Sequence, residues 1–119
     1  MRGKHALRID QRLTVAAAGL ATVRTDPVPP GTEWMCERIV FEGSSATSGG
    51  NTRARVYVGG HGPKYYLFEQ DAPTADTLYW EDDHNRLYPG EWLALEWDQA
   101  QVSAQLILQV TGYYELEGE

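Results

Sequence analysis

The sequence predicts an all-β fold, an antiparallel β-sandwich of about eight short strands. Apolar and polar residues alternate with a period of two in several segments, which places alternate side chains on opposite faces of a sheet. Breaks rich in Gly, Pro and Ser recur at a spacing of roughly 8 to 12 residues, as in sandwiches and jelly rolls. No segment is long enough and periodic enough for a substantial helix. The order of the strands stays open, so a jelly roll and an immunoglobulin-like sandwich are both compatible with the pattern.

The first half of the chain contains two weaker strand candidates and one stronger one. Residues 13–17 and 20–24 are short apolar stretches on either side of a glycine turn. A break at residues 27–31 contains three prolines. Residues 34–41 follow it and are partly apolar on both faces, as expected near the middle of a sandwich.

The second half supplies the clearest alternation. In residues 53–58, which follow a Ser/Gly-rich loop at 43–50, Ala54, Val56 and Val58 share one face. Arg and Tyr side chains share the other face, so this segment predicts a half-buried strand. The remaining candidates are residues 65–68, 78–80, 91–98 and 104–110.

Size and composition exclude several classes of protein. The 119 residues fit a single domain, and a net charge of −7 has the wrong sign for holding phosphate backbones, so we expect no nucleic-acid partner. No apolar run approaches the ~20 residues that span a bilayer, so no integral membrane protein is expected. Cys36 is the one cysteine, so no disulfide can form within the chain, and we expect a buried thiol.

The N-terminal residues differ in charge from the rest of the chain. Residues 1–12 carry +3, and because the total is −7, residues 13–119 carry −10. We therefore predict a basic N-terminal arm at 1–12 and a β-sandwich domain at 13–119, and the arm is either a solvated tail or docks on an acidic neighbour. A signal peptide matches this region only superficially, so synthesis in the cytoplasm is expected. The charged residues of the arm are Arg2, Lys4, Asp10, Arg8 and Arg12.

Sites for catalysis or metal binding are not evident. None of the three histidines belongs to a spacing typical of a nucleophile, a zinc site or a general base. Residues 81–84 form an acidic cluster, but they lack the alternation of a calcium loop and predict a solvated loop. The glycines at 59–62 lack the lysine and helix of a phosphate loop. We expect no enzyme, no cofactor and no metal.

Aromatic residues are the other informative class, at 13 of 119 residues. Trp34 and Trp97 have the phase of core residues. The others can stack on sugar rings, as in carbohydrate-binding modules, or lie at the buried centre of a subunit interface, where aromatics are enriched. The candidate interface residues, basic and aromatic, are Arg2, Lys4, Arg8, Arg12, Tyr65, Tyr66, Trp80 and Trp92.

Two motifs carry a resemblance. The break Pro27-Val28-Pro29-Pro30-Gly31 is followed by Glu33-Trp34, Arg38-Ile39-Val40 and, after a Ser/Gly-rich loop, Arg55-Val56-Tyr57-Val58-Gly59. Downstream stands Leu87-Tyr88-Pro89-Gly90-Glu91-Trp92-Leu93, with a strand that ends in Trp97. In these motifs the chain resembles small virion proteins of tailed bacteriophages, particularly those that infect actinobacteria.

The resemblance implies an accessory structural part of a virion, synthesised in the cytoplasm of the bacterial host. Its expected role is capsid-surface decoration, with assembly through the arm and the exposed aromatics into a homo-oligomer, a trimer being favoured. The expected partner is the major capsid protein or a tail protein of the same virion. Two alternatives stay open: a tail or baseplate accessory protein, and a carbohydrate-binding module for adhesion to a host surface glycan.

Overall fold

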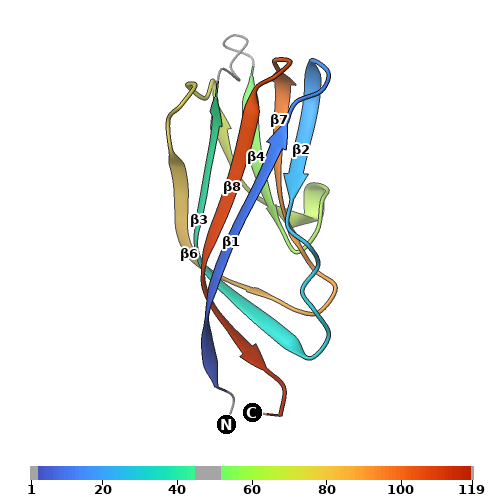
Figure 1. The fold of residues 1–119 in the computed structure, drawn as a ribbon, viewed down its shortest axis with the longest axis vertical. Helices are drawn as coiled ribbons and strands as arrows, with labels where there is room; N and C mark the ends of the chain where they lie inside the picture. The colour runs from blue at the N-terminus through green and yellow to red at the C-terminus, as the bar shows by residue number, and fades with distance from the viewer. Residues whose placement is uncertain (1–2, 45–51, 119) are drawn as a thin grey trace.

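The computed structural model describes residues 3–44 and 52–118, and in them the chain folds into eight strands in two antiparallel sheets (Figure 1). Sheet A has the order β1-β8-β3-β6 and sheet B the order β2-β7-β4-β5. A 3-10 turn, η1 (Pro63–Tyr65), precedes β5. The strands are β1 (Lys4–Thr14), β2 (Gly19–Arg24), β3 (Thr32–Ser44), β4 (Arg53–Val58), β5 (Tyr66–Asp71), β6 (Tyr79–Leu87), β7 (Leu93–Ala100) and β8 (Gln105–Leu116).

The pairing of the strands identifies the fold as a jelly roll. β1 pairs with β8, β2 with β7, β3 with β6 and β4 with β5, so the chain forms one long antiparallel hairpin of four strand pairs. The hairpin is rolled up, and the pairs β3–β8 and β4–β7 join it into two sheets. Eight strands paired in this order in two sheets form a jelly roll. The fold is therefore a jelly roll and not an immunoglobulin-like sandwich, the other arrangement compatible with the sequence.

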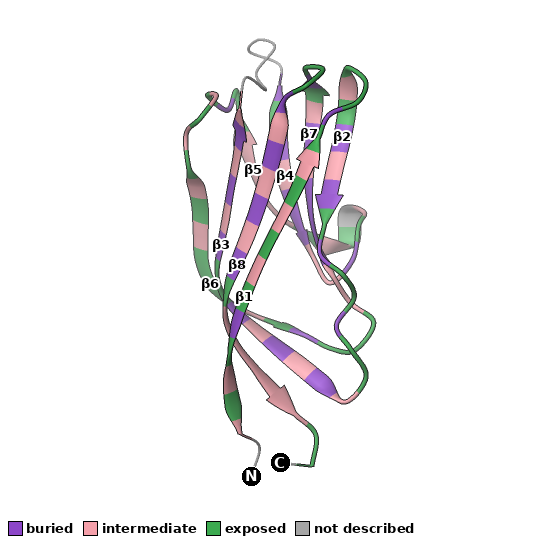
Figure 2. Cartoon of the chain, viewed as in Figure 1, coloured by how far each residue is buried: buried purple, intermediate pink, exposed green. Residues whose placement is uncertain are grey.

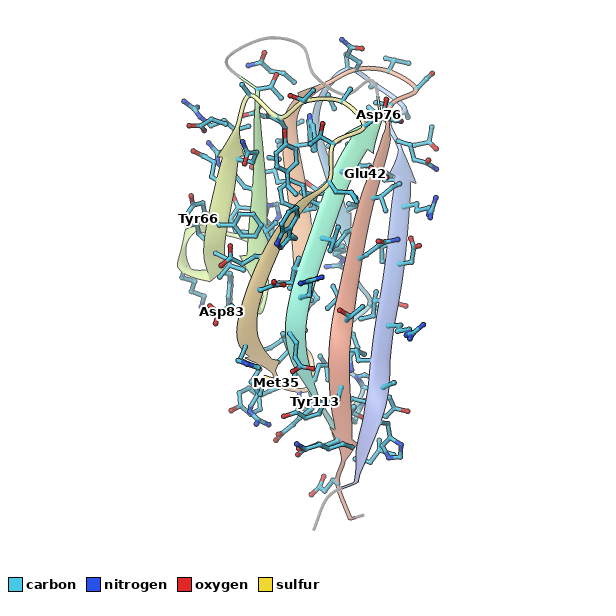
Figure 3. The ribbon with its side chains drawn as sticks, turned by 90° about the vertical axis from the view of Figure 1, so that its left-hand side faces the viewer. Met35, Glu42, Tyr66, Asp76, Asp83 and Tyr113 are labelled. Carbon is cyan, nitrogen blue, oxygen red and sulfur yellow. The ribbon has the colours of Figure 1, made fainter. Side chains whose placement is uncertain are left out.

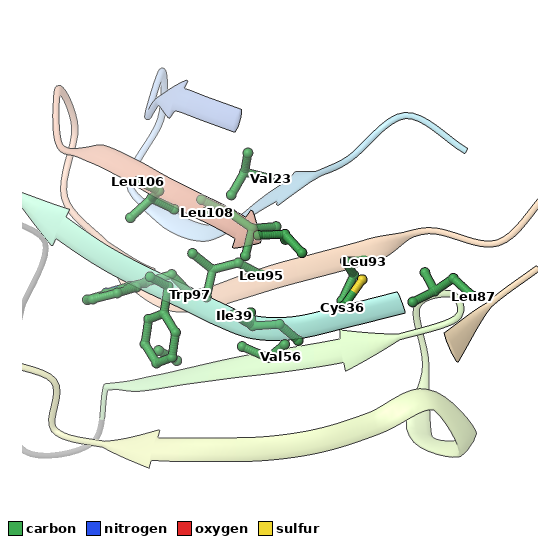
Figure 4. Close-up of a cluster of buried hydrophobic side chains, with 14 of the residues drawn as sticks. Val23, Cys36, Ile39, Val56, Leu87, Leu93, Leu95, Trp97, Leu106 and Leu108 are labelled. Atoms are coloured by element: carbon green, nitrogen blue, oxygen red, sulfur yellow. The ribbon is translucent and has the colours of Figure 1, made fainter. Parts of the chain in front are cut away.

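The core lies between the two sheets and follows the alternation (Figure 2). In β8, Leu106, Leu108 and Val110 are fully buried, while the residues between them are half-buried on the other face. Trp97 of β7 is also fully buried, and the sulfur of Cys36 lies in the same apolar cluster (Figure 4). Burial of such apolar surface is the main stabilising contribution in a sandwich of this size.

The all-β prediction is confirmed, and the stronger strand candidates were placed correctly. β4 has the bounds that its alternation predicted, residues 53–58. The candidate at 34–41 lies in the longer strand β3, and the candidate at 104–110 lies in the longer strand β8 except for Ala104. The candidate at 91–98 lies mostly in β7.

The predicted arm is largely a strand instead of a separate segment. Residues 4–14 form β1, which pairs with β8 along its whole length, so the proposed boundary after residue 12 falls inside a strand (Figure 1). Leu7 is buried, and Ile9 and Leu13 pack against the core, while charged residues alternate with them on the outer face. Because charged residues occupy most of the exposed positions of β1, its alternation was not recognised from the sequence. Residues 1–2 lie outside the described part of the chain.

The acidic cluster at 81–84 is also part of a strand and not a loop. It belongs to β6, an edge strand that pairs with β3. Asp82 lies opposite Arg38 of β3 and pairs with it, so a cross-strand partner stabilises the strand despite its charge.

Candidate assembly surface

The outer face of sheet A brings together several of the residues singled out in the sequence. Figure 3 shows β6, β3, β8 and β1 side by side, with side chains projecting from them. Because side chains alternate along a strand, the residues that do not enter the core form one continuous surface, here called the sheet A face. Cross-strand register places Arg8 and Arg38 on either side of Thr111 on this face.

One end of the sheet A face is apolar. Trp80 of β6 is 60% exposed and Leu78, just before that strand, is 53% exposed. Together with Val40 and Arg38 they line an open depression of about 300 Å³. We call Val40, Leu78 and Trp80 the Trp80 patch. Exposed apolar side chains that gather at one place commonly mark a contact surface.

The middle of the sheet A face carries an open groove of about 600 Å³ over β1 and β8. Glu37 lines it, in an irregularity where β3 shifts register against both of its neighbours. Gly112 of β8 also lines the groove, and it adds no side chain to fill it. Such bulges re-aim side chains and locally change the twist of a sheet.

Two ion pairs hold charged residues on this face. Arg38 donates to both carboxylate oxygens of Asp82, at 2.5 Å from Nε and 2.8 Å from Nη2. Arg12 forms the same bidentate pair with Asp10, at 3.0 Å from Nε and 3.1 Å from Nη2. In each case the hydrogen bond from the arginine lowers the pKa of the aspartate below its ordinary value of 3.8.

A second polar cluster lies on sheet B, around Arg55 of β4. Its Nε donates to Glu69 at 2.7 Å, and Glu96 lies within 3.4 Å of Nη1. Glu96 also contacts the Tyr57 hydroxyl at 3.4 Å and His61 Nε2 at 2.6 Å. The bond to Glu69 raises the pKa of Arg55, and burial raises that of Tyr57. The polar groups already bind one another, so the cluster reinforces the sheet.

Sequence reasoning missed this cluster, although its signal was present. Arg53, Arg55 and Tyr57 form the polar face of a strand that was correctly predicted. Their acidic partners come from β5 and β7, and the register between strands cannot be read from one strand alone.

The candidate interface residues divide between the two sheets. Lys4, Arg8 and Arg12 are exposed on β1, and Trp80 shares the sheet A face with them. The rest belong to the sheet B half: Tyr65 lies in η1, Tyr66 in β5 and Trp92 just before β7, where Arg24 covers its ring at 4.7 Å. The aromatics do not form a single platform. Arg2 lies outside the described residues.

The described residues also bear on metal binding and membrane insertion. Within residues 3–44 and 52–118, no group of three or more His, Cys, Asp or Glu side chains could hold a metal ion. In the same residues, the structure contains no helix of the length and hydropathy that would cross a membrane.

Comparison with known proteins identifies the fold and no family. No family model matches the chain, and no curated protein matches it. Among solved structures, a chain from the acidic stable capsid structure of Helicobacter pylori bacteriophage KHP30 matches with a TM-score of 0.64 at 14% identity. The match covers 98% of this chain and 94% of that one. At this identity the likeness concerns the fold alone.

Two further solved structures match less well. One is described as a CBM4 structure, with a TM-score of 0.36, 13% identity and coverage of 91% of this chain and 83% of that one. The other comes from Bacillus endospore appendages, with a TM-score of 0.36, 9% identity and coverage of 93% and 90%. Their TM-scores are too low to support any argument about function.

Proposed function

We propose that the chain is a structural component of a bacteriophage virion. The likeness in fold to a chain of the KHP30 capsid structure carries this proposal, because it extends over nearly the whole of both chains. A fold hosts many functions, so the argument also needs a surface suited to assembly.

The sheet A face supports a role in assembly. It exposes Trp80 and Leu78 beside charged residues, and the centre of protein interfaces is enriched in aromatics with a polar rim. The ionisable cluster around Arg55 is internally paired and offers no free nucleophile or base. A structural role without catalysis accounts for both features.

The finer role that we propose is decoration of the capsid surface by a homo-oligomer, with a trimer favoured and the major capsid protein as partner. A place in the tail or baseplate is the alternative. The fold likeness supports a phage virion without selecting a host, and an actinobacterial host rests on the sequence resemblance alone.

Purified particles test this proposal. Particles from the lysate of the host that produces the chain are banded by density, and their peptides are quantified by mass spectrometry. The chain should band with DNA-filled particles in a constant ratio to the major capsid protein, and immunogold labelling should mark heads. Labelling of tails would select the alternative. A chain that stays in the soluble fraction would overturn the virion proposal.

Carbohydrate binding makes a different prediction. A glycan array probed with the folded chain should then give signals that Trp80→Ala or Trp92→Ala abolishes. We expect no such signals, because the structure separates these two rings between sheet A and the sheet B half.

A further inference from the structure

The two sides of the sandwich carry opposite charge. β1 and β2 contact each other on one side, and by formal charge they hold +3. β5 and β6 line a common depression on the other side and hold −4. We call these the basic side and the acidic side. Figure 3 shows β1 and β6, with Asp83 labelled on β6, at opposite edges of sheet A.

Part of this charge is not neutralised within the chain. Asp10 binds Arg12, Asp82 binds Arg38, and Glu69 binds Arg55, so these carboxylates are already paired. Among the described residues, Arg8 on the basic side has no ion-pair partner. Glu81 and Asp83 on the acidic side have none either.

The edges of sheet A can also accept another strand. In the described residues, β1 pairs only with β8, and β6 pairs only with β3. All neighbours in the sheet are antiparallel, so β6 runs opposite to β1. A second copy placed in the same orientation beside the first would therefore bring its β1 antiparallel to β6. Unpaired edges of this kind readily add a strand from another chain.

We propose that copies of this chain assemble head to tail, with the β1 edge of one copy against the β6 edge of the next. This inference rests on the proposed virion role and names the surface that the copies share. Arg8 of one copy faces Asp83 of its neighbour. Glu81, opposite the buried Ile39 and so on the other face of β6, adds negative charge to the same edge. The neighbour's Trp80, next to these carboxylates in β6, is covered by arginine and lysine stems, which pack well on aromatic faces.

Charge argues against the symmetric arrangement. An isologous contact would place β1 against β1 or β6 against β6 and so bring like charges together, which opposes association. A head-to-tail contact uses two different surfaces and closes into a ring when the rotation between copies permits. The trimer favoured above is one such ring.

Sedimentation of the full chain and two charge-reversed variants tests the contact. The basic-edge variant carries Lys4→Glu and Arg8→Glu, and the acidic-edge variant carries Glu81→Lys and Asp83→Lys. At 0.1 M salt the native chain should associate with a dissociation constant below about 1 mM. This constant should rise at least about tenfold at 1 M salt, where the screening length falls from about 10 Å to about 3 Å.

Each variant alone should sediment as a monomer, whereas their equimolar mixture should associate into dimers or larger assemblies in which the two variants alternate. Alternation joins the two reversed edges at one contact and the two native edges at the next, and a closed ring of three is not expected from the mixture. Lys64→Glu and Asp26→Lys, which are exposed outside both edges, serve as matched controls and should associate like the native chain. Circular dichroism verifies that every variant is folded. A variant that associates alone, a mixture that stays monomeric, or a native chain that stays monomeric up to about 1 mM would each overturn the inference. If the chain is nevertheless found in particles, the virion proposal stands and only the edge contact fails.

Discussion

Gly112 of β8 lies directly against the backbone of Met35 in β3: a Cβ built on Gly112 would overlap the Met35 carbonyl oxygen. This close approach occurs where β3 shifts register, at the centre of sheet A. The missing side chain lets the two strands stay paired through the irregularity. Backbone atoms cannot move aside as the end of a flexible side chain can. Any residue larger than glycine would therefore force the backbone of β3 or β8 to shift here.

A larger residue in place of Gly112 should therefore lower the stability of the fold. Gly112→Ala is expected to lower the free energy of unfolding by about 1–3 kcal/mol, the usual range for overpacking. Urea denaturation measures the effect. Thr111→Ala, at the neighbouring exposed position, is the control and should change stability by less than about 0.5 kcal/mol. Equal stability of the two variants would contradict the close approach.

Substitution of Trp97 should affect the stability of the chain, whereas substitution of Trp80 should affect its assembly. Trp97 is fully buried in the core, so Trp97→Ala should cost about 3–5 kcal/mol of stability. Trp80 is exposed, so Trp80→Ala should change the stability of the isolated chain by less than about 0.5 kcal/mol and yet reduce its incorporation into particles. Thermal unfolding and quantitative mass spectrometry of particles measure the two effects. Normal incorporation of the Trp80 variant would remove Trp80 from the interface.

Cys36 should be unreactive in the folded chain. It is fully buried, and burial raises the pKa of its thiol from 9.0 to about 12, which lowers the thiolate fraction about a thousandfold at pH 8. Alkylation by iodoacetamide should be slower in the native chain by at least this factor than in the chain unfolded in guanidinium. A native rate close to the unfolded rate would place Cys36 outside the core.

Arg55 should matter more for stability than Arg38. Its side chain is partly buried between Glu69 and Glu96, so Arg55→Ala leaves two carboxylates close together and should cost about 1–3 kcal/mol. Arg38 pairs with Asp82 at an exposed site that solvent screens, so Arg38→Ala should lower stability less than Arg55→Ala does. Urea midpoints of the two variants give the comparison, and the reverse order would contradict it.

Acid should weaken the fold partly through Asp10 and Asp82. The folded-state pKa of each is lowered by its arginine, so each pair stabilises the fold above pH 3.8 and loses this contribution as pH falls through the lowered value. Asp82→Asn should therefore lower the urea midpoint slightly at pH 7 and leave it nearly unchanged at pH 2. The effect is small because both pairs are exposed to solvent. An equal loss at both pH values would exclude this linkage.

The sequence predicted the fold class because its inner strands alternate cleanly. The β4 segment, residues 53–58, lies between two other strands, so its apolar face had to match the core, and its bounds were predicted correctly. The jelly-roll order could not be predicted, because it depends on which strands pair across long separations, such as β1 with β8.

The edge strands were the main failures, for one physical reason. β1 and β6 each have one side of their backbone and one face of their side chains toward solvent, so they tolerate many charges. Lys4, Arg8 and Arg12 were therefore assigned to an arm, and residues 81–84 to a loop. The positive charge that the sequence shows in residues 1–12 lies mostly on β1 at one edge of sheet A, and β6 at the opposite edge carries a net negative charge.

A cryo-EM reconstruction of the intact particle tests the central claim most directly. The account predicts symmetry-related copies of this jelly roll in the virion, with Trp80 covered and the β1 edge of each copy against the β6 edge of the next. A particle without this density, or with copies whose β1 and β6 edges and Trp80 all face solvent, would contradict the account.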